Sequence, residues 1–481
     1  MSVLRQFGLV ALLVGTIFGQ GWVGEGRVSV RDTSSSQPSI AMSSSGVPWV
    51  VWHGYYGGFS LMYSKWLGDR WDEERGVSPN APGVVCRLRP SLGVGDNGIL
   101  CLVWHNASSN NARDIGSCFW VDTCWSQETQ VNLPDSIEDD DYAPKVACGG
   151  GQVWCVWYGG RQSLYSVFAS RWNDDIGRWE PEMQVSPPDG RLHWWCDVGV
   201  DSLGTPHVVW CTHPLYTVFY SYYTGDSWTT PIPVNDTTKV TASPWADPHI
   251  VIDRTGMMHL SFTGAYRGAS HRDIFYTRND GSGWDTCQLV TRDAVYDEWY
   301  SDIAADRPDN VWVVWNRQNE GPDQFRVYAS HYDGKEWSPE ERLDTDSAYR
   351  DGGAVICLDN NGCPWVVWNA TTYQSQDNDI YYNRYMSVGL EEYSGLGRNR
   401  KFIWTSVCAG SFKIVYELPT SSWTRLEVFD ALGRSLVTIV DERKSAGRHE
   451  TRWTGGVPGG VYFFLLTTPK FKQKCKTVCI K

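Results

Sequence analysis

The chain has 481 residues, more than one ordinary domain holds, so two or more domains are expected. Hydrophobic residues make up 42% and aromatic residues 14%, including 27 Trp, which excludes a disordered chain. Residues 400–481 carry 14 Lys/Arg and 6 Asp/Glu, a local net charge of +8, which leaves −21 for residues 1–399. A body this acidic repels polyanions, so no nucleic-acid partner is expected.

The first 21 residues have the pattern of a secretory signal peptide. Arg5 supplies a basic start, residues 7–18 an apolar stretch, and Gly19-Gln20-Gly21 a small-residue cleavage site. The alternative is a membrane anchor, but the apolar stretch is shorter than the ~20 residues that a spanning helix needs. We therefore expect residues 1–21 to be removed on export, and the mature chain to contain no transmembrane segment.

An internal repeat of 52 or 53 residues fixes the expected architecture of residues 22–386. Each unit has an apolar strand, a turn, a second strand ending in an aromatic residue, a third strand rich in Tyr and Phe, and a Gly turn to a closing Trp. The aromatic residues that end the second strands are Trp52, Trp104, Trp157, Trp210, Phe262, Trp315 and Trp368. Four short strands per unit predict an all-β fold, a β-propeller of seven blades.

The fourth strand of each unit has its own pattern, and the seventh unit lacks it. Six residues after the closing Trp stands Val or Leu, followed by a small or polar residue, as in Val131-Asn132 and Val185-Ser186. No closing Trp follows Tyr385, but Trp22 is followed six residues later by Val28-Ser29. We therefore expect the amino-terminal strand to complete the seventh blade and close the ring.

The turn into the fourth strand resembles the Asp box of sialidases and related BNR-repeat propellers. Thr277-Arg278-Asn279-Asp280-Gly281-Ser282-Gly283-Trp284 is the best copy, and Ser330 to Trp337 retains Ser, Gly and Trp. In that family the box is a structural turn away from the active face, so the resemblance implies a fold rather than catalysis. Sialidases usually have six blades and an early Arg-Ile-Pro motif, which this sequence lacks.

Residues 400–481 resemble the carboxy-terminal sorting domain of type IX secretion cargo, which is related to the Ig-like module of flagellar hook-capping proteins. The matching segments are Tyr416–Pro419, Leu426–Asp430, Leu432–Arg434, Ala446–Arg448, Trp453, Gly460–Phe463 and Lys481. The resemblance implies a small β-sandwich, the type IX secretion machinery as a partner, and a secreted or cell-surface protein of a bacterium with an outer membrane. A generic Ig-like adhesion module is the alternative. Residues 387–399 would be the linker.

The loops that lead into the first strands of blades four to seven pair carboxylates with aromatic rings. They are His193-Trp194-Trp195-Cys196-Asp197, Pro244-Trp245-Ala246-Asp247, Asp297-Glu298-Trp299-Tyr300-Ser301-Asp302 and Tyr349-Arg350-Asp351. Rings stack on the apolar face of a sugar while Asp accepts hydrogen bonds from its hydroxyls. With Arg317, an expected carboxylate-binding cation on the same face, the candidate ligand-binding residues are Trp194, Trp195, Asp197, Trp245, Asp247, Trp299, Tyr300, Asp302, Arg317, Arg350 and Asp351. The alternative is that the rings pack between blades and Asp caps loop amides.

No sequence motif indicates a catalytic apparatus, a metal site or a cofactor. The acidic run Glu138–Asp141 could bind calcium but is more typical of a solvated loop. Three Cys pairs (118 with 124, 148 with 155, 357 with 363) are close enough in sequence to bridge neighbouring strands. Buried thiols are the equal alternative.

Three functions remain open at this point. The first is a non-catalytic glycan-binding propeller. The second is a glycan-degrading enzyme: a hydrolase using Asp247 and Asp302 as acid and base, or a polysaccharide lyase using His193, Tyr300 and Arg350. The third is a protein-binding scaffold.

Overall fold

The computed structural model is all-β, as expected, and divides into two compact units, residues 22–386 and residues 387–481 with 1–21. It describes residues 21–30, 34–56, 59–77, 84–95, 97–108, 113–132, 140–161, 164–243, 246–292, 295–318, 325–344, 348–372, 377–386, 403–408, 411–418, 420–429, 435–453, 460–468 and 472–479. The predicted signal peptide up to residue 20 and the linker 387–399 lie outside them. No described segment forms a helix of the length and hydropathy needed to cross a bilayer.

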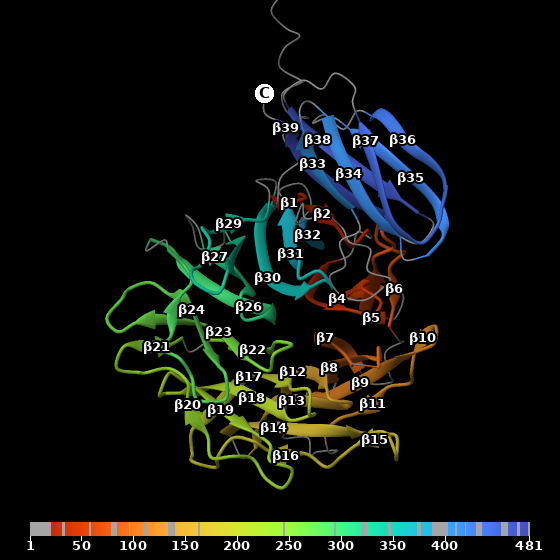
Figure 1. Ribbon diagram of the computed structural model, residues 1–481. Helices are drawn as coiled ribbons and strands as arrows, with labels where there is room; N and C mark the ends of the chain where they lie inside the picture. The colour runs from red at the N-terminus through yellow and green to blue at the C-terminus, as the bar shows by residue number, and fades with distance from the viewer. Residues whose placement is uncertain are drawn as a thin grey trace, which may run out of the picture. The chain divides into compact units, whose positions relative to one another are not determined.

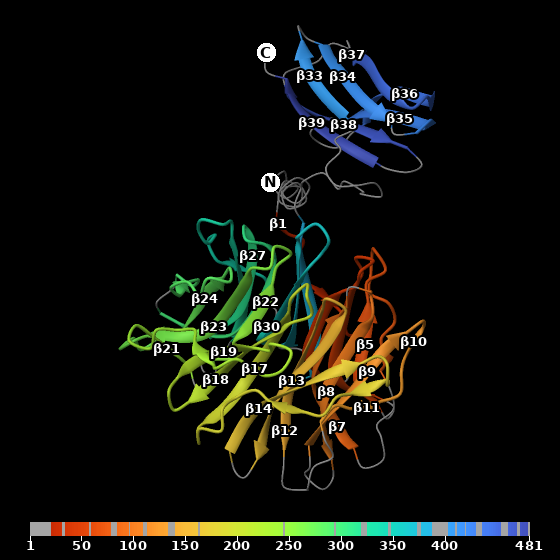
Figure 2. The same cartoon turned by 60° about the horizontal axis from the view of Figure 1, so that its bottom comes forward.

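The described residues of the first unit form seven small antiparallel sheets, six of them built from consecutive strands (Figures 1 and 2). The first is β3 (Ser35–Met42), β4 (Pro48–Tyr56), β5 (Phe59–Lys65) and β6 (Arg75–Gly76). The second is β7 (Val84–Val94), β8 (Leu100–Ser108), β9 (Arg113–Val121), β10 (Cys124–Trp125) and β11 (Thr129–Gln130). The third is β12 (Asp141–Gly149), β13 (Gln152–Arg161), β14 (Leu164–Asn173), β15 (Arg178–Trp179) and β16 (Met183–Gln184).

The remaining sheets follow the same order. The fourth is β17 (Leu192–Val200), β18 (Pro206–His213), β19 (Thr217–Tyr222) and β20 (Ile232–Pro233). The fifth is β21 (Val240–Ala242), β22 (His249–Ile252), β23 (Met258–Tyr266), β24 (Asp273–Asn279) and β25 (Gln288–Leu289). The sixth is β26 (Asp297–Arg307), β27 (Asn310–Gln318), β28 (Phe325–Tyr332) and β29 (Glu341–Arg342). The seventh is β30 (Ala348–Leu358), β31 (Pro364–Thr372) and β32 (Asn378–Met386), joined by β1 (Gly21–Trp22) and β2 (Gly26–Arg27).

The repeated aromatic residues form the cores between the sheets. The repeated Trp residues lie within the second strands, not at their ends as expected; each of their side chains is at most 1% exposed, and Phe262 is fully buried. Trp52 of the first sheet packs in one cluster with Trp365 and Ile380 of the seventh sheet. The first and last sheets are therefore neighbours, although they are more than 300 residues apart in sequence.

The polar residue of the fourth-strand pattern bonds to the backbone of the third strand. Asn132 Oδ1 accepts a hydrogen bond from Ile115 N (2.9 Å), and Ser186 Oγ accepts one from Val167 N (2.9 Å). In the seventh sheet the same bond is made by the amino-terminal segment, where Ser29 Oγ accepts from Ile380 N at 3.0 Å. The amino terminus thus replaces the strand that the seventh repeat lacks.

The Asp-box-like turns have a structural role, as the resemblance implied. Thr277 Oγ1 donates to the carbonyl of Asp285 (2.8 Å), and Ser330 Oγ donates to the carbonyl of Ser338 (2.9 Å). Asn279 Oδ1, at the Asp position, accepts from the backbone N–H groups of Gly281 and Gly283. These bonds close the turn before the fourth strand.

The three sequence-close Cys pairs do not form disulfide bonds. Cys118, Cys155 and Cys357, one from each pair, are thiols. Burial raises the pKa of Cys155 and Cys357 well above the ordinary value, so both stay protonated at neutral pH.

The second unit contains two small sheets packed on one core. One sheet is β33 (Ile403–Cys408), β34 (Ser411–Leu418) and β37 (Gly447–Trp453). The other is β36 (Ser435–Lys444), β35 (Ser422–Phe429), β38 (Gly460–Thr467) and β39 (Lys472–Cys479). Phe412 and Tyr416 of the first pack against Leu426 and Phe464 of the second. Residues 432–434 and Lys481 of the sorting-domain motif lie outside the described residues.

Candidate functional site

Seven residues spaced by one repeat each share a left-handed backbone conformation. One lies in or just before the innermost strand of each sheet: Gln37 (φ 54°), Arg89 (51°), Ala143 (46°), Trp195 (48°), Asp247 (38°), Tyr300 (50°) and Gly353 (59°). In six sheets the strand pairing slips at this point, as between Ser36 and Ser39 or between Leu88 and Ser91. A bulge of this kind redirects a side chain, and a non-glycine residue adopts it at an energetic cost.

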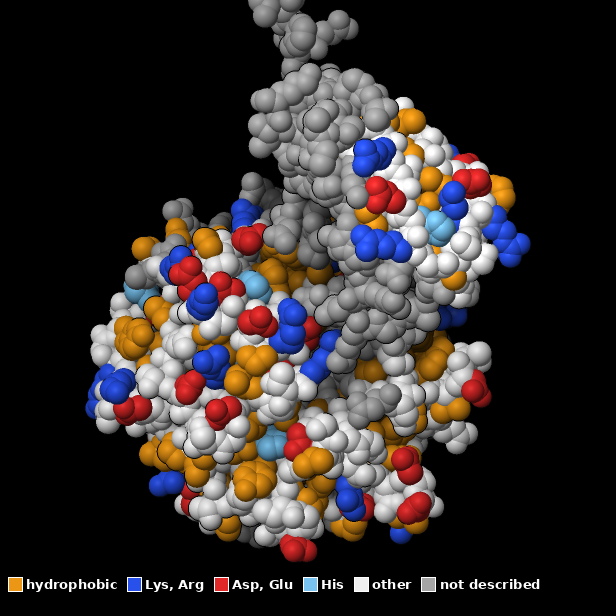
Figure 3. All heavy atoms as spheres, viewed as in Figure 1, with side chains coloured by type: hydrophobic (Ala, Val, Ile, Leu, Met, Phe, Trp, Pro, Cys, Tyr) orange, Lys and Arg blue, Asp and Glu red, His pale blue; other side chains and the backbone are white. Residues whose placement is uncertain are grey.

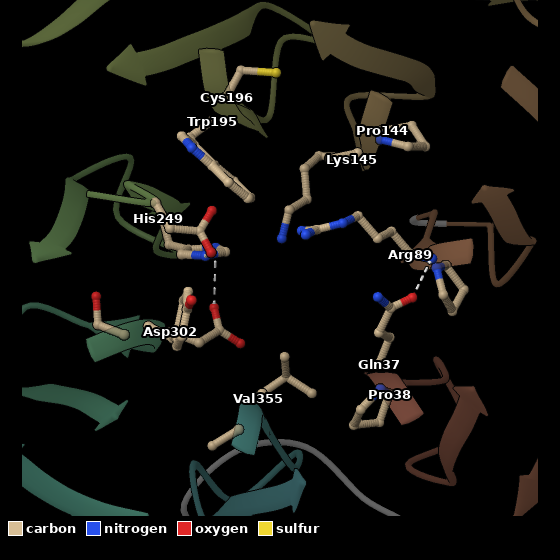
Figure 4. Close-up of a pocket in the computed structure, with 17 residues that line it drawn as sticks. Gln37, Pro38, Arg89, Pro144, Lys145, Trp195, Cys196, His249, Asp302 and Val355 are labelled. Atoms are coloured by element: carbon tan, nitrogen blue, oxygen red, sulfur yellow. Dashed lines mark hydrogen bonds and ion pairs between the residues drawn. The ribbon is translucent and has the colours of Figure 1, made fainter. Parts of the chain in front are cut away.

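These seven positions surround one cavity of about 240 Å³, to which all seven sheets contribute (Figure 4). The cavity lies toward one end of the sheets, the end at which β17 begins and β18 finishes. There Leu192, the first residue of β17, pairs with His213, the last residue of β18. The lining residues are Gln37, Pro38, Arg89, Pro90, Ala143, Pro144, Lys145, Trp195, Cys196, Asp247, His249, Tyr300, Ser301, Asp302, Gly353, Ala354 and Val355.

Charges are segregated across this cavity. Arg89 and Lys145, from β7 and β12, point into it from one side, and His249 and Asp302 lie on the other (Figure 4). On the outer face shown in Figure 3, by contrast, acidic and basic side chains are interspersed. The cavity therefore offers a cationic wall and a carboxylate-rich wall to a ligand.

His249 lies between three carboxylates. Its Nε2 is 3.6 Å from Asp247 Oδ2, and its Nδ1 is 3.4 Å from both Asp197 Oδ2 and Asp302 Oδ1. Burial and Lys145 lower the pKa of His249, but Asp247 and Asp197 outweigh them and raise it to about 10. The side chain is thus an imidazolium at neutral pH and cannot accept a proton there.

The carboxylates on either side of His249 have pKa values shifted in opposite directions. Burial raises the pKa of Asp247, but His249 and Lys145 lower it by a larger amount, so that the resulting pKa is about 2. For Asp302, burial is the larger effect, and the pKa is raised although His249 and Lys145 oppose this. Asp247 is therefore the more readily ionised of the two.

Two of the predicted site carboxylates also hold neighbouring sheets together. Asp197 Oδ2 accepts a hydrogen bond from Ile250 N (3.0 Å), and Asp302 Oδ2 accepts one from Ile356 N (2.9 Å). Ser39 and Ser91, at the equivalent position of the first two sheets, accept from Leu92 N and Val146 N at 3.1 Å. Both carboxylates thus have a structural role, and of the two only Asp302 is among the described residues that line the cavity.

Of the predicted site residues, Trp195, Asp247, Tyr300 and Asp302 line the cavity. Tyr300 is the exposed ring, with 40% of its surface accessible, whereas Trp195 is 8% exposed and has the Arg89 guanidinium 4.9 Å from its ring centre. The sequence analysis missed Arg89, Lys145 and His249. Their positions in the repeat could have identified them. Arg89 is itself the left-handed residue of its repeat, and Lys145 and His249 each follow that residue by two positions.

Trp194 and Trp299 are not among the described residues that line the cavity. Trp194 packs, partly buried, between hydrophobic clusters, and Trp299 lies under Arg272, whose guanidinium is 4.2 Å from its ring centre. Trp245 lies outside the described residues. Arg350 and Asp351 belong to β30, where their backbones pair with Thr371 and Ala370.

Arg317 was predicted to be a cation exposed to ligand, and the structure contradicts this. It is 5% exposed, with Glu298 Oε1 and Glu340 Oε2 each 2.6 Å from its guanidinium. Its positive charge is thus balanced by carboxylates of its own repeat.

His193, one of the three suggested lyase residues, is also enclosed. Its Nδ1 accepts from the Trp210 indole (3.0 Å), and its Nε2 donates to Asp189 (3.0 Å). Burial lowers its pKa although Asp189 opposes this. The triad of His193, Tyr300 and Arg350 therefore receives no support from the position of His193.

The described residues contain no group of three or more His, Cys, Asp or Glu side chains arranged to hold a metal ion. Of the acidic run, Asp141 is fully buried and pairs with Arg161 at 3.0 Å, while Glu138 and Asp139 lie outside the described residues.

The sequence matches no family model and no curated protein. Its structure is similar to an ulvan lyase of polysaccharide lyase family 25, bound to -[GlcA(1-4)Rha3S]-, with a TM-score of 0.52 and 9% identity over 74% of this chain and 94% of that chain. It also resembles a Penicillium chrysogenum α-L-arabinanase complexed with arabinobiose (TM-score 0.45, 12% identity, 76% and 98% covered). A Hadza microbial sialidase has a TM-score of 0.41 and 13% identity, with 70% and 76% covered. At such identities the lyase likeness shows the fold alone, and residues 22–386 have a β-propeller fold.

Proposed function

We propose that this chain is an exported carbohydrate-binding protein whose seven sheets form a closed seven-bladed propeller. The ligand enters the central cavity, and the amino-terminal strand closes the ring. The carboxy-terminal unit is an Ig-like sorting domain that directs the protein through type IX secretion to the medium or the cell surface.

The observation that carries the proposal is the cavity itself. Seven strands bring a left-handed residue to its wall, and backbone strain of this kind persists at binding sites when the surrounding fold enforces it. Tyr300 offers an exposed ring, and Asp247 offers a carboxylate in the same cavity. A ring next to fixed hydrogen-bonding groups suits the two faces of a sugar. The ulvan lyase with this fold is itself bound to a saccharide, which supports the proposal by analogy.

The cavity size suggests one sugar residue rather than an oligosaccharide. Its volume of about 240 Å³ is below the roughly 300–1,000 Å³ typical of drug-sized ligand pockets. We therefore expect weak recognition of a terminal sugar, with a Kd between ~1 mM and ~1 μM.

A glycan array probed with the full chain tests the proposal, with Tyr300→Ala as the site variant. Alanine is compatible with this backbone, since Ala143 occupies the same position in the third sheet. The variant should bind about threefold to tenfold more weakly, the value of one aromatic contact. Tyr222→Ala removes a ring of similar exposure (39%) on β19, outside the cavity, and should bind as wild type. Wild type that binds no glycan would contradict the proposal.

Glycan hydrolysis is the second candidate, because the pKa values of Asp247 and Asp302 are shifted in opposite directions. Release of reducing ends from a bound polysaccharide, lost in Asp302→Asn with binding retained, would favour it. Binding without turnover favours the first candidate, and binding of a protein partner alone favours a scaffold.

A further inference from the structure

Arg89 and Lys145, which line the cavity, differ in their partners from Arg87 and Arg161. Arg87 pairs with Glu128 at 2.6 Å, and Arg161 pairs with Asp141 at 3.0 Å. Within the part of the chain that the structure describes, neither Arg89 nor Lys145 forms an ion pair, and the Arg89 guanidinium instead covers the Trp195 ring. The cavity thus contains two cations that no carboxylate contacts directly.

The nearby carboxylates already have partners. Asp197 and Asp302 each accept a backbone hydrogen bond from the next sheet and contact His249. Asp247 faces the other nitrogen of the same imidazolium. These three carboxylates raise the pKa of Lys145 although burial lowers it, so its ammonium is charged at neutral pH. They stabilise that charge without contacting it.

Arg89 and Lys145 also point toward one another (Figure 4). Like charges at close range repel, and an anion between them would relieve the repulsion and satisfy their free donors. An Arg fork and an ammonium together are typical of sites for carboxylate or sulfate oxygens.

We propose that Arg89 and Lys145 bind the anionic group of an acidic saccharide, with the rest of the sugar directed toward Tyr300 and Asp247. This inference rests on the proposed function and specifies its ligand class. The opposite wall carries carboxylates, so a second anionic group there would be repelled, whereas hydroxyls could donate to Asp247. The site therefore selects a sugar with one anionic group rather than a uniformly charged polyanion.

The test compares matched sugars by calorimetry on the full chain. The probes are the methyl glycosides of glucuronic and galacturonic acid, their neutral parents glucose and galactose, and the 6-sulfates of the same two sugars. We expect wild type to bind at least one acidic probe about tenfold or more tightly than its neutral parent, because hydrogen bonds between charged groups are the strong ones. Tighter binding of the uronides would identify a carboxylate as the ligand group, and tighter binding of the sulfates would identify a sulfate.

The site variant is Arg89→Gln with Lys145→Ser. The fold tolerates both residues at these positions, since Gln37 and Ser39 occupy them in the first sheet. The double variant should lose the acidic preference and bind the acidic sugar no more tightly than its neutral parent. Arg178→Gln, at an exposed arginine on β15, is the matched control and should bind as wild type.

The possible outcomes distinguish a failure of this inference from a failure of the proposed function on which it rests. Equal binding of acidic and neutral sugars by wild type overturns the anionic-ligand inference and leaves carbohydrate binding intact. An acidic preference that survives in the double variant also overturns it. Binding of none of the probes, with no hit on the glycan array, overturns both.

Discussion

The carboxylate of Asp302 joins two sheets: its Oδ2 accepts a hydrogen bond from the backbone N–H of Ile356 at 2.9 Å. Asp302 Oδ1 also accepts from Ile303 N at 2.9 Å. Because Asn keeps one oxygen acceptor and Ala keeps none, comparing Asp302→Asn with Asp302→Ala measures what an acceptor at this position contributes. Both variants remove the charge near His249. We expect Ala to lower the free energy of unfolding by about 1–2 kcal/mol more than Asn, as measured by urea denaturation at pH 7. Equal losses would show that the contact between sheets contributes nothing.

His249 should make the stability of the propeller depend on pH. Its pKa is raised from 6.5 to about 10, so its contribution is fully present below pH 6.5 and is lost as the pH rises through 10. At pH 6.5 and below we expect His249→Gln to be less stable than wild type by on the order of 2–5 kcal/mol. That difference should disappear by about pH 10.5. An NMR titration of the imidazole that gives a pKa near 6.5 would contradict the expectation.

Removing the buried charge of Arg317 should be more damaging than removing that of Arg161. Arg317 is 5% exposed between Glu298 and Glu340, whereas Arg161 is 22% exposed between Asp141 and Glu182. Arg317→Met leaves a fully buried carboxylate unpaired and should lower the free energy of unfolding by about 3–5 kcal/mol. Arg161→Met also leaves a buried carboxylate, but Asp141 keeps hydrogen bonds from the Asn132 amide and the Trp157 indole, so this variant should cost less. Unfolding curves of the two variants compare them directly, and the reverse order would contradict this account.

Deleting residues 22–31 should destabilise the propeller strongly. The deletion removes β1 and β2 from β32 and exposes that strand as a sheet edge. The milder variant Ser29→Ala removes the acceptor for Ile380 N and the hydroxyl that donates to Asp379, and it should lower stability by about 1–2 kcal/mol. Melting curves of the mature chain measure both effects. An unchanged melting temperature after the deletion would refute ring closure by the amino terminus.

Removing residues 400–481 should block export and leave the propeller folded. The reason is the proposed sorting role of the tail, together with the separate core of its described strands. Quantifying the protein in the growth medium and in the cells tests the first part, and a melting curve of the truncated protein tests the second. Wild-type levels of the truncated chain in the medium would remove the sorting role.

The repeat made the sheets predictable because its signals are local. Trp52 and its equivalents mark the second strands, and Val28-Ser29 identified the segment that pairs with β32. Much of the site followed from the same spacing: Trp195, Asp247 and Tyr300 each stand 15 residues before the second-strand aromatic residue. The same offset leads to Arg89 from Trp104. Pro38, Pro90, Pro144 and Pro248 directly follow the left-handed residue in four repeats, a further signal of its position.

Other parts of the site could not be predicted from residue types. Trp194 and Trp195 are adjacent aromatic residues, and the left-handed turn at Trp195 determines which ring lines the cavity. Arg317 resembled a ligand-binding cation until burial placed it between two carboxylates that are distant in sequence. Contacts of this kind depend on tertiary packing, which a pattern of residue types does not specify.

The backbone at the seven cavity positions keeps one conformation whichever side chain occupies them. Glutamine, arginine, alanine, tryptophan, aspartate, tyrosine and glycine all occupy one geometry, from Gln37 to Gly353. A substitution at any of them therefore changes what the cavity presents to solvent without requiring a new path for the chain. Exchanging residues among these positions, singly or in combination, would yield cavities of different chemistry on one backbone. Point mutations alone are therefore enough to diversify what this cavity presents.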